Sequence, residues 1–124
     1  LNVASTAAFQ PGPLMAVYYA TKAYVLSFSE ALRQEVIPSR VTVTCLCPGP
    51  TKTGFQNNAN LQKSKLFTHG AMDAATVAHL GFAGMMAGKE LVIPGIKNRI
   101  GAFATRFVPI RVAATIAKSI QSVK

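Results

Sequence analysis

Apolar residues along this chain come in short blocks separated by proline and glycine, and these blocks predict alternating strands and helices. Residues 1–4 predict the end of a buried strand, and the small residues of 5–13 predict a loop that closes on a Pro-Gly-Pro turn at 11–13. Residues 15–36 predict one long helix, because they are good or tolerable helix formers and Pro38 lies just beyond them. The many Ala and Ser residues of this helix favour close packing against other elements.

A second apolar block, residues 41–47, is β-branched and uncharged, which predicts a strand buried on both faces of a parallel sheet. A Pro-Gly-Pro sequence at 48–50 ends this strand. Cys45 and Cys47 are two positions apart in it, so their side chains are expected to point the same way. We interpret them as small buried apolar side chains rather than as a disulfide or a zinc site, and we expect no bound metal.

The polar stretch 51–72 separates this strand from the rest of the chain and predicts an excursion of the kind that forms lids or binding loops. Beyond it, the pattern predicts a helix over 74–87, a short buried strand over 91–93, and a helical region over 99–122 that breaks near Pro109. The resulting order of strand, helix, strand, excursion, helix, strand and helix indicates βαβ units.

The predicted fold class is α/β: the C-terminal half of a doubly wound, Rossmann-like parallel sheet with about three strands and flanking helices. Residues 1–124 are expected to form the catalytic and substrate-binding half of a single domain. A complete sheet of this type has about six strands and begins with a Gly-rich turn, and no G-x-G-x-x-G sequence occurs in this chain. We therefore expect the N-terminal nucleotide-binding half to be absent from the sequence.

The composition supports a folded core, since 50% of the residues are apolar and 14% are charged. The formal net charge is +9, but the cations are scattered rather than gathered in one stripe, so we expect no nucleic-acid partner. No apolar stretch reaches the ~18 residues of a membrane-spanning helix, and no signal peptide opens the chain. We expect a cytoplasmic protein.

Tyr18 and Lys22 are four residues apart in the predicted helix and therefore share a face. A phenol with a pKa of ~10 is a poor proton donor or acceptor at neutral pH. An ammonium about 4 Å away, at an effective dielectric constant of ~20, contributes roughly 4 kcal/mol and lowers the phenol pKa by up to ~3 units. Such a pair suits proton transfer to or from an alcohol oxygen. Tyr19 lies three residues before Lys22 and is the local alternative.

Residues 18–22 read Tyr-Tyr-Ala-Thr-Lys, Ser5 lies 13 residues before Tyr18, and a Pro-Gly turn at 48–49 follows the next predicted strand. In these features the chain resembles the short-chain dehydrogenase/reductase family, whose signature is Tyr-x-Ala-(Ser/Thr)-Lys. That family has its catalytic serine at the same offset and a Pro-Gly turn at the corresponding place. The offset favours Tyr18 over Tyr19 as the catalytic tyrosine.

The resemblance implies a catalytic set and a cofactor. Tyr18 would exchange a proton with the substrate oxygen, Lys22 would hold the nicotinamide ribose and lower the pKa of Tyr18, and Ser5 would donate a hydrogen bond to the substrate oxygen. The cofactor would be NAD or NADP, and the substrate a small-molecule secondary alcohol or ketone. The cofactor-binding residues that the family pattern implies are Tyr18, Lys22, Pro48, Gly49, Thr51 and Thr53, with Thr53 slightly preferred over Thr51 for the carboxamide.

The excursion corresponds in this family to a variable substrate loop. Its apolar residues are expected either to line the substrate pocket or to anchor the loop to the core; they are Phe55, Leu61, Leu66 and Phe67. His69 and His79 have no motif around them and are assigned no role. The last helical region mixes apolar and basic residues, and we expect it to pack on the body of the protein or on another subunit rather than on a membrane.

These observations predict an NAD(P)-dependent oxidoreductase that transfers a hydride between nicotinamide and a secondary alcohol or ketone and that works as a homo-oligomer. Without a nucleotide-binding half, the chain of 124 residues by itself is expected to be inactive. One alternative is a non-catalytic assembly fragment built on the small-residue helix 15–36. A less favoured alternative is a cationic protein of membrane surfaces.

Overall fold

The computed structural model describes residues 1–54 and 70–121. Its central sheet has parallel strands in the order β1-β2-β5, where β1 is Asn2–Val3, β2 is Cys45–Leu46 and β5 is Leu91–Val92. The register places Cys45 between Asn2 on one side and Leu91 on the other. The predicted α/β class with parallel strands is confirmed.

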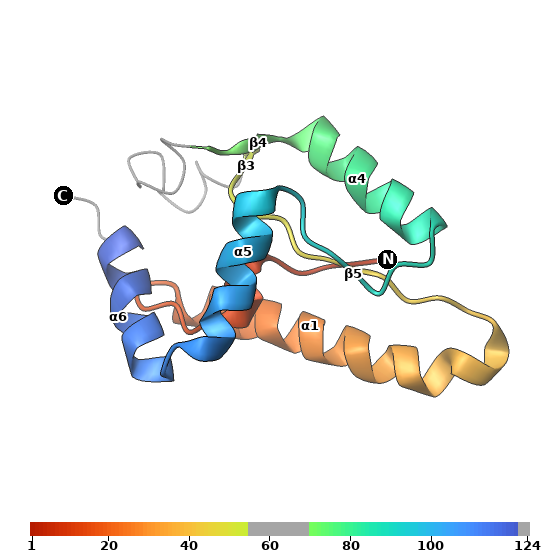
Figure 1. The fold of residues 1–124 in the computed structure, drawn as a ribbon, viewed down its shortest axis with the longest axis horizontal. Coiled ribbons are helices and arrows are strands. Elements are labelled where there is room, and N and C mark those ends of the chain that lie inside the picture. The colour runs from red at the N-terminus through yellow and green to blue at the C-terminus, as the bar shows by residue number, and fades with distance from the viewer. Residues whose placement is uncertain (55–69, 122–124) are drawn as a thin grey trace.

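Two helices flank this sheet, one on each side in Figure 1. Helix α1, Ala16–Val36, connects β1 to β2 and lies where the helix over 15–36 is predicted. A short 3₁₀ turn, η2, Ile37–Ser39, follows it at Pro38, because proline cannot continue an α-helix. Helix α4, Ala74–Met86, precedes β5. The two helices supply the layers that a buried parallel sheet requires.

Successive side chains of β2 point to opposite faces of the sheet, and each face packs against a different helix. Cys45 and Cys47 are fully buried free thiols with their Sγ atoms 3.8 Å apart, and Val25 of α1 packs against their cluster, as the sequence predicts. Leu46 points to the other face, where a Cβ added to Gly81 of α4 would overlap its side chain. The missing side chain at Gly81 thus lets α4 approach the sheet closely.

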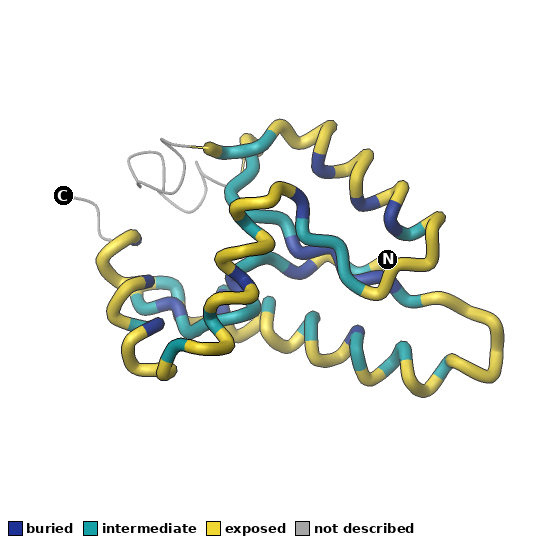
Figure 2. The backbone as a smooth tube through the Cα atoms, in the orientation of Figure 1, coloured by how far each residue is buried: buried dark blue, intermediate teal, exposed yellow. Residues whose placement is uncertain are grey.

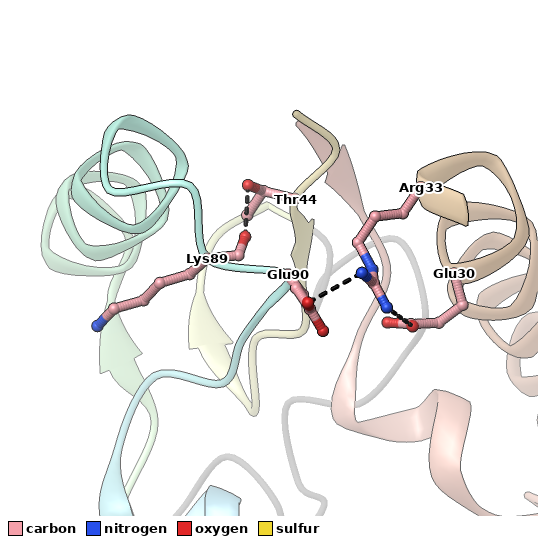
Figure 3. Close-up of polar contacts among 5 residues, drawn as sticks. All are labelled: Glu30, Arg33, Thr44, Lys89 and Glu90. Carbon is pink, nitrogen blue, oxygen red and sulfur yellow. Dashed lines mark hydrogen bonds and ion pairs between the residues drawn. The ribbon is translucent and has the colours of Figure 1, made fainter. Parts of the chain in front are cut away.

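The strand predicted over 41–47 is shorter than expected. Only Cys45–Leu46 pair as a strand, and Val41 is exposed. The strand is short because each neighbouring strand, β1 and β5, has only two residues that pair with it. Thr44 is nevertheless buried: its Oγ1 donates a hydrogen bond of 2.6 Å to the carbonyl oxygen of Lys89, just before β5 (Figure 3). This contact satisfies a buried hydroxyl beside the sheet.

Arg33 links α1 to the segment that leads into β5 (Figure 3). Its Nη1 lies 2.9 Å from Oε1 of Glu90, and its Nη2 lies 3.6 Å from Oε2 of Glu30, one turn earlier in α1. The Glu90 side chain is mostly exposed, and such pairs contribute about 0.2–1 kcal/mol. The pair therefore orients the two segments more than it stabilises them.

A second ladder, which the sequence pattern does not predict, brackets the excursion. Strand β3, Thr51–Lys52, pairs in parallel with β4, Met72–Asp73, and residues 55–69 lie outside the described part of the chain. Strand β4 leads directly into α4, where the Asp73 carboxylate accepts a hydrogen bond of 3.0 Å from the backbone N–H of Thr76. This N-cap holds the pKa of the Asp73 carboxyl below its usual value.

The C-terminal region forms helices that break where the sequence predicts. They are α5, Ile96–Ala104, the 3₁₀ turn η3, Thr105–Phe107, and α6, Ile110–Gln121. The helical region begins earlier than 99, and its break falls at Pro109. Helix α6 buries Ala113, Ala117 and Gln121 one turn apart, while most other positions of α5 and α6 are exposed (Figure 2).

Candidate active site

A cavity of about 1000 Å³ opens at the carboxyl ends of β1 and β2. These strand ends are the place where doubly wound folds bind their ligands. Helices α1, α4 and α5 and the turn after β2 supply further walls. The catalytic and cofactor residues expected from the sequence all line this cavity: Ser5, Tyr18, Lys22, Pro48, Gly49, Thr51 and Thr53.

Ser5 lies where the chain leaves β1. Its Oγ accepts a hydrogen bond of 3.1 Å from the backbone N–H of Ala7 and so caps the 3₁₀ turn η1, Thr6–Phe9. The same hydroxyl donates a hydrogen bond of 3.3 Å to the carbonyl oxygen of Pro48. Ser5 therefore joins the end of β1 to the turn after β2, at the wall of the cavity.

Tyr18 and Lys22 lie one turn apart on the same side of α1, as their spacing predicts, and both line the cavity. The Nζ of Lys22 is 5.8 Å from the centre of the Tyr18 ring. It also donates a hydrogen bond of 3.1 Å to the carbonyl oxygen of Val3 in β1. A positive charge at this position stabilises negative charge that develops on an oxygen nearby.

Tyr19 differs from its neighbour in burial and in partners. It is buried beneath Gly12, where a Cβ would overlap the Tyr19 ring, and Nε2 of Gln121 in α6 donates a hydrogen bond to its Oη. Burial raises the pKa of the Tyr19 phenol. These contacts give Tyr19 a packing role, which favours Tyr18 as the reactive tyrosine of the pair.

The turn at 48–50 forms another wall of the cavity. The Oγ1 of Thr51 donates a hydrogen bond of 2.9 Å to the carbonyl oxygen of Gly49, which closes the turn on itself. Thr53 is more exposed than Thr51, and both line the cavity. The sequence-based preference for Thr53 over Thr51 as the cofactor contact stays a prediction.

Asn98 of α5 is a cavity residue that the sequence analysis missed. Its Nδ2 donates a hydrogen bond of 2.7 Å to the carbonyl oxygen of Pro94, and its side chain fills the space that a Cβ on Gly49 would occupy. One signal was available in the sequence: a Pro-Gly pair occurs at 48–49 and again at 94–95, after neighbouring strands. Asn98 lies between these two turns and sets their separation.

The remaining sequence expectations fall elsewhere. The expected substrate-loop residues lie outside the described part of the chain, as does His69; they are Phe55, Leu61, Leu66 and Phe67. His79 is exposed on α4 and does not itself line the cavity, although its neighbour Ala78 does. Within 1–54 and 70–121, no three potential metal ligands gather in one place, and none of the helices is long and apolar enough to cross a bilayer.

Comparison with known proteins finds relatives of this region. The family model described as short chain dehydrogenase matches residues 1–64. Dehydrogenase/reductase SDR family member 4 of Homo sapiens is 36% identical to the chain over 63 residues, which are 51% of this chain and 23% of that protein. The chain therefore spans about a quarter of the length of this curated relative.

Two solved structures are similar over most of the described fold. The short-chain dehydrogenase from Sphingobium yanoikuyae in complex with NADPH has a TM-score of 0.69 and 27% identity, covering 86% of this chain and 41% of that chain. A short chain dehydrogenase from Burkholderia cenocepacia in complex with NADP has a TM-score of 0.70 and 27% identity, covering 85% of this chain and 42% of that chain. The chain spans about two fifths of the length of these solved relatives.

Proposed function

Because the chain belongs to the short-chain dehydrogenase family, we propose that it carries the catalytic and substrate-binding half of an NAD(P)-dependent oxidoreductase. The proposed reaction is hydride transfer between a nicotinamide cofactor and a secondary alcohol or ketone. The observation that carries the proposal is the meeting of Ser5, Tyr18 and Lys22 in one cavity at the carboxyl ends of parallel strands.

The groups around the cavity fit a nicotinamide nucleotide. Lys22 offers an ammonium, and Ser5, Thr51 and Thr53 offer hydroxyls, which suit the hydroxyls of a ribose and a carboxamide. Gly49 lines this wall, and its missing side chain leaves room for the Asn98 side chain beside the turn. When bound, the cofactor supplies the hydride chemistry. The solved relatives in complex with NADPH and NADP support NADP as the cofactor.

In this proposal Tyr18 moves the proton. Its phenolic oxygen gives a proton to the substrate carbonyl oxygen during reduction and takes one from the alcohol in the reverse direction. Lys22 stabilises the negative charge that this leaves on Tyr18, and it exchanges its contact with the Val3 carbonyl for the ribose hydroxyls. Ser5 donates from Oγ to the substrate oxygen as charge develops there, in place of its 3.3 Å contact with the Pro48 carbonyl.

Activity is proposed for an enzyme in which further polypeptide completes the fold. The chain spans about two fifths of the length of its solved relatives, and its sequence contains no Gly-rich turn of the G-x-G-x-x-G type. The chain by itself is therefore proposed to be inactive. The free thiols of Cys45 and Cys47 fit the reducing cytoplasm, which is the proposed compartment.

Substitution of Tyr18 tests the proposal in the enzyme that contains this chain. Tyr18→Phe is expected to lower ketone reduction with NADPH by about 10²-fold or more, because it removes the proton donor. Cofactor affinity, measured by fluorescence titration of NADPH, is expected to stay nearly unchanged. Ser27→Ala is the matched control, since it also removes one hydroxyl from α1 but at an exposed position. Unaltered turnover in Tyr18→Phe would contradict the assignment.

A second function, assembly into a homo-oligomer, is favoured by the outer side of α1. Val17, Tyr24 and Phe28 are exposed there, and the Tyr24 and Phe28 rings stack with centres 5.9 Å apart. Exposed apolar clusters of this kind are typical of subunit contacts. Light scattering is expected to show an oligomer that Tyr24→Ser with Phe28→Ser dissociates. A monomeric unsubstituted chain would contradict this function.

A further inference from the structure

One side of α5 and η3 presents apolar side chains to solvent. Ile96, Ile100, Phe103 and Phe107 recur at spacings of four, three and four residues, which places them on one helical face. Phe103 is 59% exposed and Phe107 is 75% exposed, and their rings meet edge to face with centres 5.3 Å apart. We call these four residues the α5 apolar face.

The α5 apolar face is separate from the candidate active site. The cavity is lined by another side of α5, at Lys97, Asn98 and Gly101. In Figure 2 the positions coloured as exposed run along most of α5, which shows that no other described element covers this helix from outside. An exposed apolar surface of this kind marks an interaction site.

The C-terminal segment that carries the α5 apolar face has charges of one sign only. The last acidic residue of the sequence is Glu90, and residues 91–124 contain no Asp or Glu. The guanidinium carbon of Arg106 lies 5.9 Å from the centre of the Phe103 ring, so cation and aromatic ring are adjacent. The same segment contains six basic residues: Lys97, Arg99, Arg106, Arg111, Lys118 and Lys124.

A second copy of this chain fits such a surface poorly. In a two-fold dimer a surface meets itself, so Arg99 and Arg106 would meet like charges, and 91–124 offers no carboxylate to neutralise them. An anionic lipid surface supplies both missing partners, phosphates for the cations and an acyl region for the aromatic rings. Arginine suits this place because its apolar stem lies along hydrocarbon while its charged end reaches the headgroups.

We propose that the α5 apolar face lies on an anionic membrane surface, with Phe103 and Phe107 at the acyl boundary and Arg99 and Arg106 among the headgroups. This mode of binding needs no helix that crosses the bilayer. The cavity-lining side of α5 then faces away from the lipid, so ligands still reach the cavity. The proposal is independent of the reaction proposed for that cavity.

The sequence contains no tryptophan, which allows a site-specific fluorescent probe. Phe103→Trp places the probe in the α5 apolar face, and Phe82→Trp places it in α4 at a phenylalanine that is 58% exposed against 59% for Phe103. With vesicles of phosphatidylglycerol and phosphatidylcholine, the emission of the Phe103→Trp chain is expected to shift to shorter wavelength and to be quenched by lipids brominated in their acyl chains. The emission of the Phe82→Trp chain is expected to change little.

Sedimentation with the same vesicles separates the apolar and ionic contributions. Phe103→Ser with Phe107→Ser is expected to weaken binding roughly tenfold or more, whereas Phe82→Ser retains it. Arg99→Gln with Arg106→Gln is expected to weaken binding and to reduce its dependence on salt. The control with equal charge loss elsewhere, Arg40→Gln with Lys89→Gln, is expected to weaken binding less.

Several outcomes would overturn the proposal. They are equal binding to vesicles of phosphatidylcholine alone, unchanged binding of the double serine variant, and equal blue shifts at Phe103→Trp and Phe82→Trp. A chain that stays in the supernatant but forms a dimer that the double serine variant dissociates would show that a second copy is the partner instead. Circular dichroism checks the fold of each variant, and the Phe103→Trp measurement keeps the test valid if the double variant unfolds.

Discussion

The ammonium of Lys22 donates a hydrogen bond of 3.1 Å to the main-chain carbonyl oxygen of Val3 in β1, one of the two edge strands of the described three-stranded sheet. This contact joins the first third of α1 to the strand that precedes it. It holds the positive charge at the wall of the cavity, 5.8 Å from the centre of the Tyr18 ring. The fold therefore holds the Lys22 ammonium at the cavity wall, where in the proposed mechanism the ribose hydroxyls replace the Val3 carbonyl.

Removing the charge of Lys22 should affect both binding and turnover in the enzyme that contains this chain. Lys22→Met keeps an unbranched apolar side chain but loses the donor for the ribose and the charge beside Tyr18. We expect kcat/KM to fall by about 10²-fold or more, with a higher KM for the cofactor. Lys22→Arg, which keeps the charge, should recover part of the loss. Wild-type steady-state constants in Lys22→Met would contradict the proposed role.

The two adjacent tyrosines should differ in their contribution to stability. Tyr19→Phe deprives the buried Gln121 amide of its acceptor, so we expect a loss of about 1–3 kcal/mol in the free energy of unfolding. Tyr18→Phe removes a hydroxyl from a half-buried side chain, where the loss of a contact costs less, and should lower the free energy of unfolding less than Tyr19→Phe does. Urea denaturation of the chain followed by circular dichroism measures both. The reverse ranking would show that Tyr18 is the structural residue.

The phenol of Tyr19 should also make stability depend on alkaline pH. Burial raises its pKa in the folded state above the ordinary value of about 10. The fold therefore favours the neutral phenol, so its stabilising effect is complete below about pH 10 and is lost as the pH rises through the higher folded-state pKa. Titration of phenolate absorbance should show a late-titrating tyrosine. A late phase that survives in Tyr19→Phe would assign it to another residue.

Gly49 and Asn98 should behave as one packing unit. Gly49→Ala introduces a Cβ that overlaps the Asn98 side chain, and we expect a loss of about 1–3 kcal/mol in the free energy of unfolding. Asn98→Ala frees that space. The double variant should therefore lose less free energy of unfolding than the sum of the losses of the two single variants, with a coupling of about 1 kcal/mol. A double-mutant cycle in urea measures the coupling. Simple additivity would mean that the turn moves away from Asn98 without cost.

Some elements could be predicted because their cause is local. Pro38 and Pro109 end helical stretches through their own geometry, and Asp73 caps α4 through a contact within one turn. The β3–β4 ladder could not be predicted, because Thr51–Lys52 and Met72–Asp73 are too short and too polar to show a strand pattern. The two strands pair because the fold brings the two ends of the stretch 51–72 side by side. A contact of this kind leaves no periodic pattern in the sequence.

The candidate site divides in the same way. Tyr18 and Lys22 lie on one helix, so their spacing in sequence already predicts that they share a face. Ser5 was predicted only through the resemblance to the family, because a loop and a 3₁₀ turn separate it from α1. Asn98 reaches the cavity only through the packing of α5 beside the turn at Gly49. The lengths of the strands were likewise determined by their neighbours, which is why Val41 is exposed although its β-branched side chain favours a strand.

The hydrogen bond between Gln121 and Tyr19 joins positions 102 residues apart, so its formation closes almost the whole chain into a loop. Closing so long a loop is entropically unfavourable, and the contacts that offset the loss form only when α6 docks. We therefore expect α6 to dock after the transition state of folding. Substitutions at Ala113 or Ala117, which α6 buries, would then accelerate unfolding while leaving the refolding rate nearly unchanged. Helix α6 would govern how long the folded state lasts rather than how fast it forms.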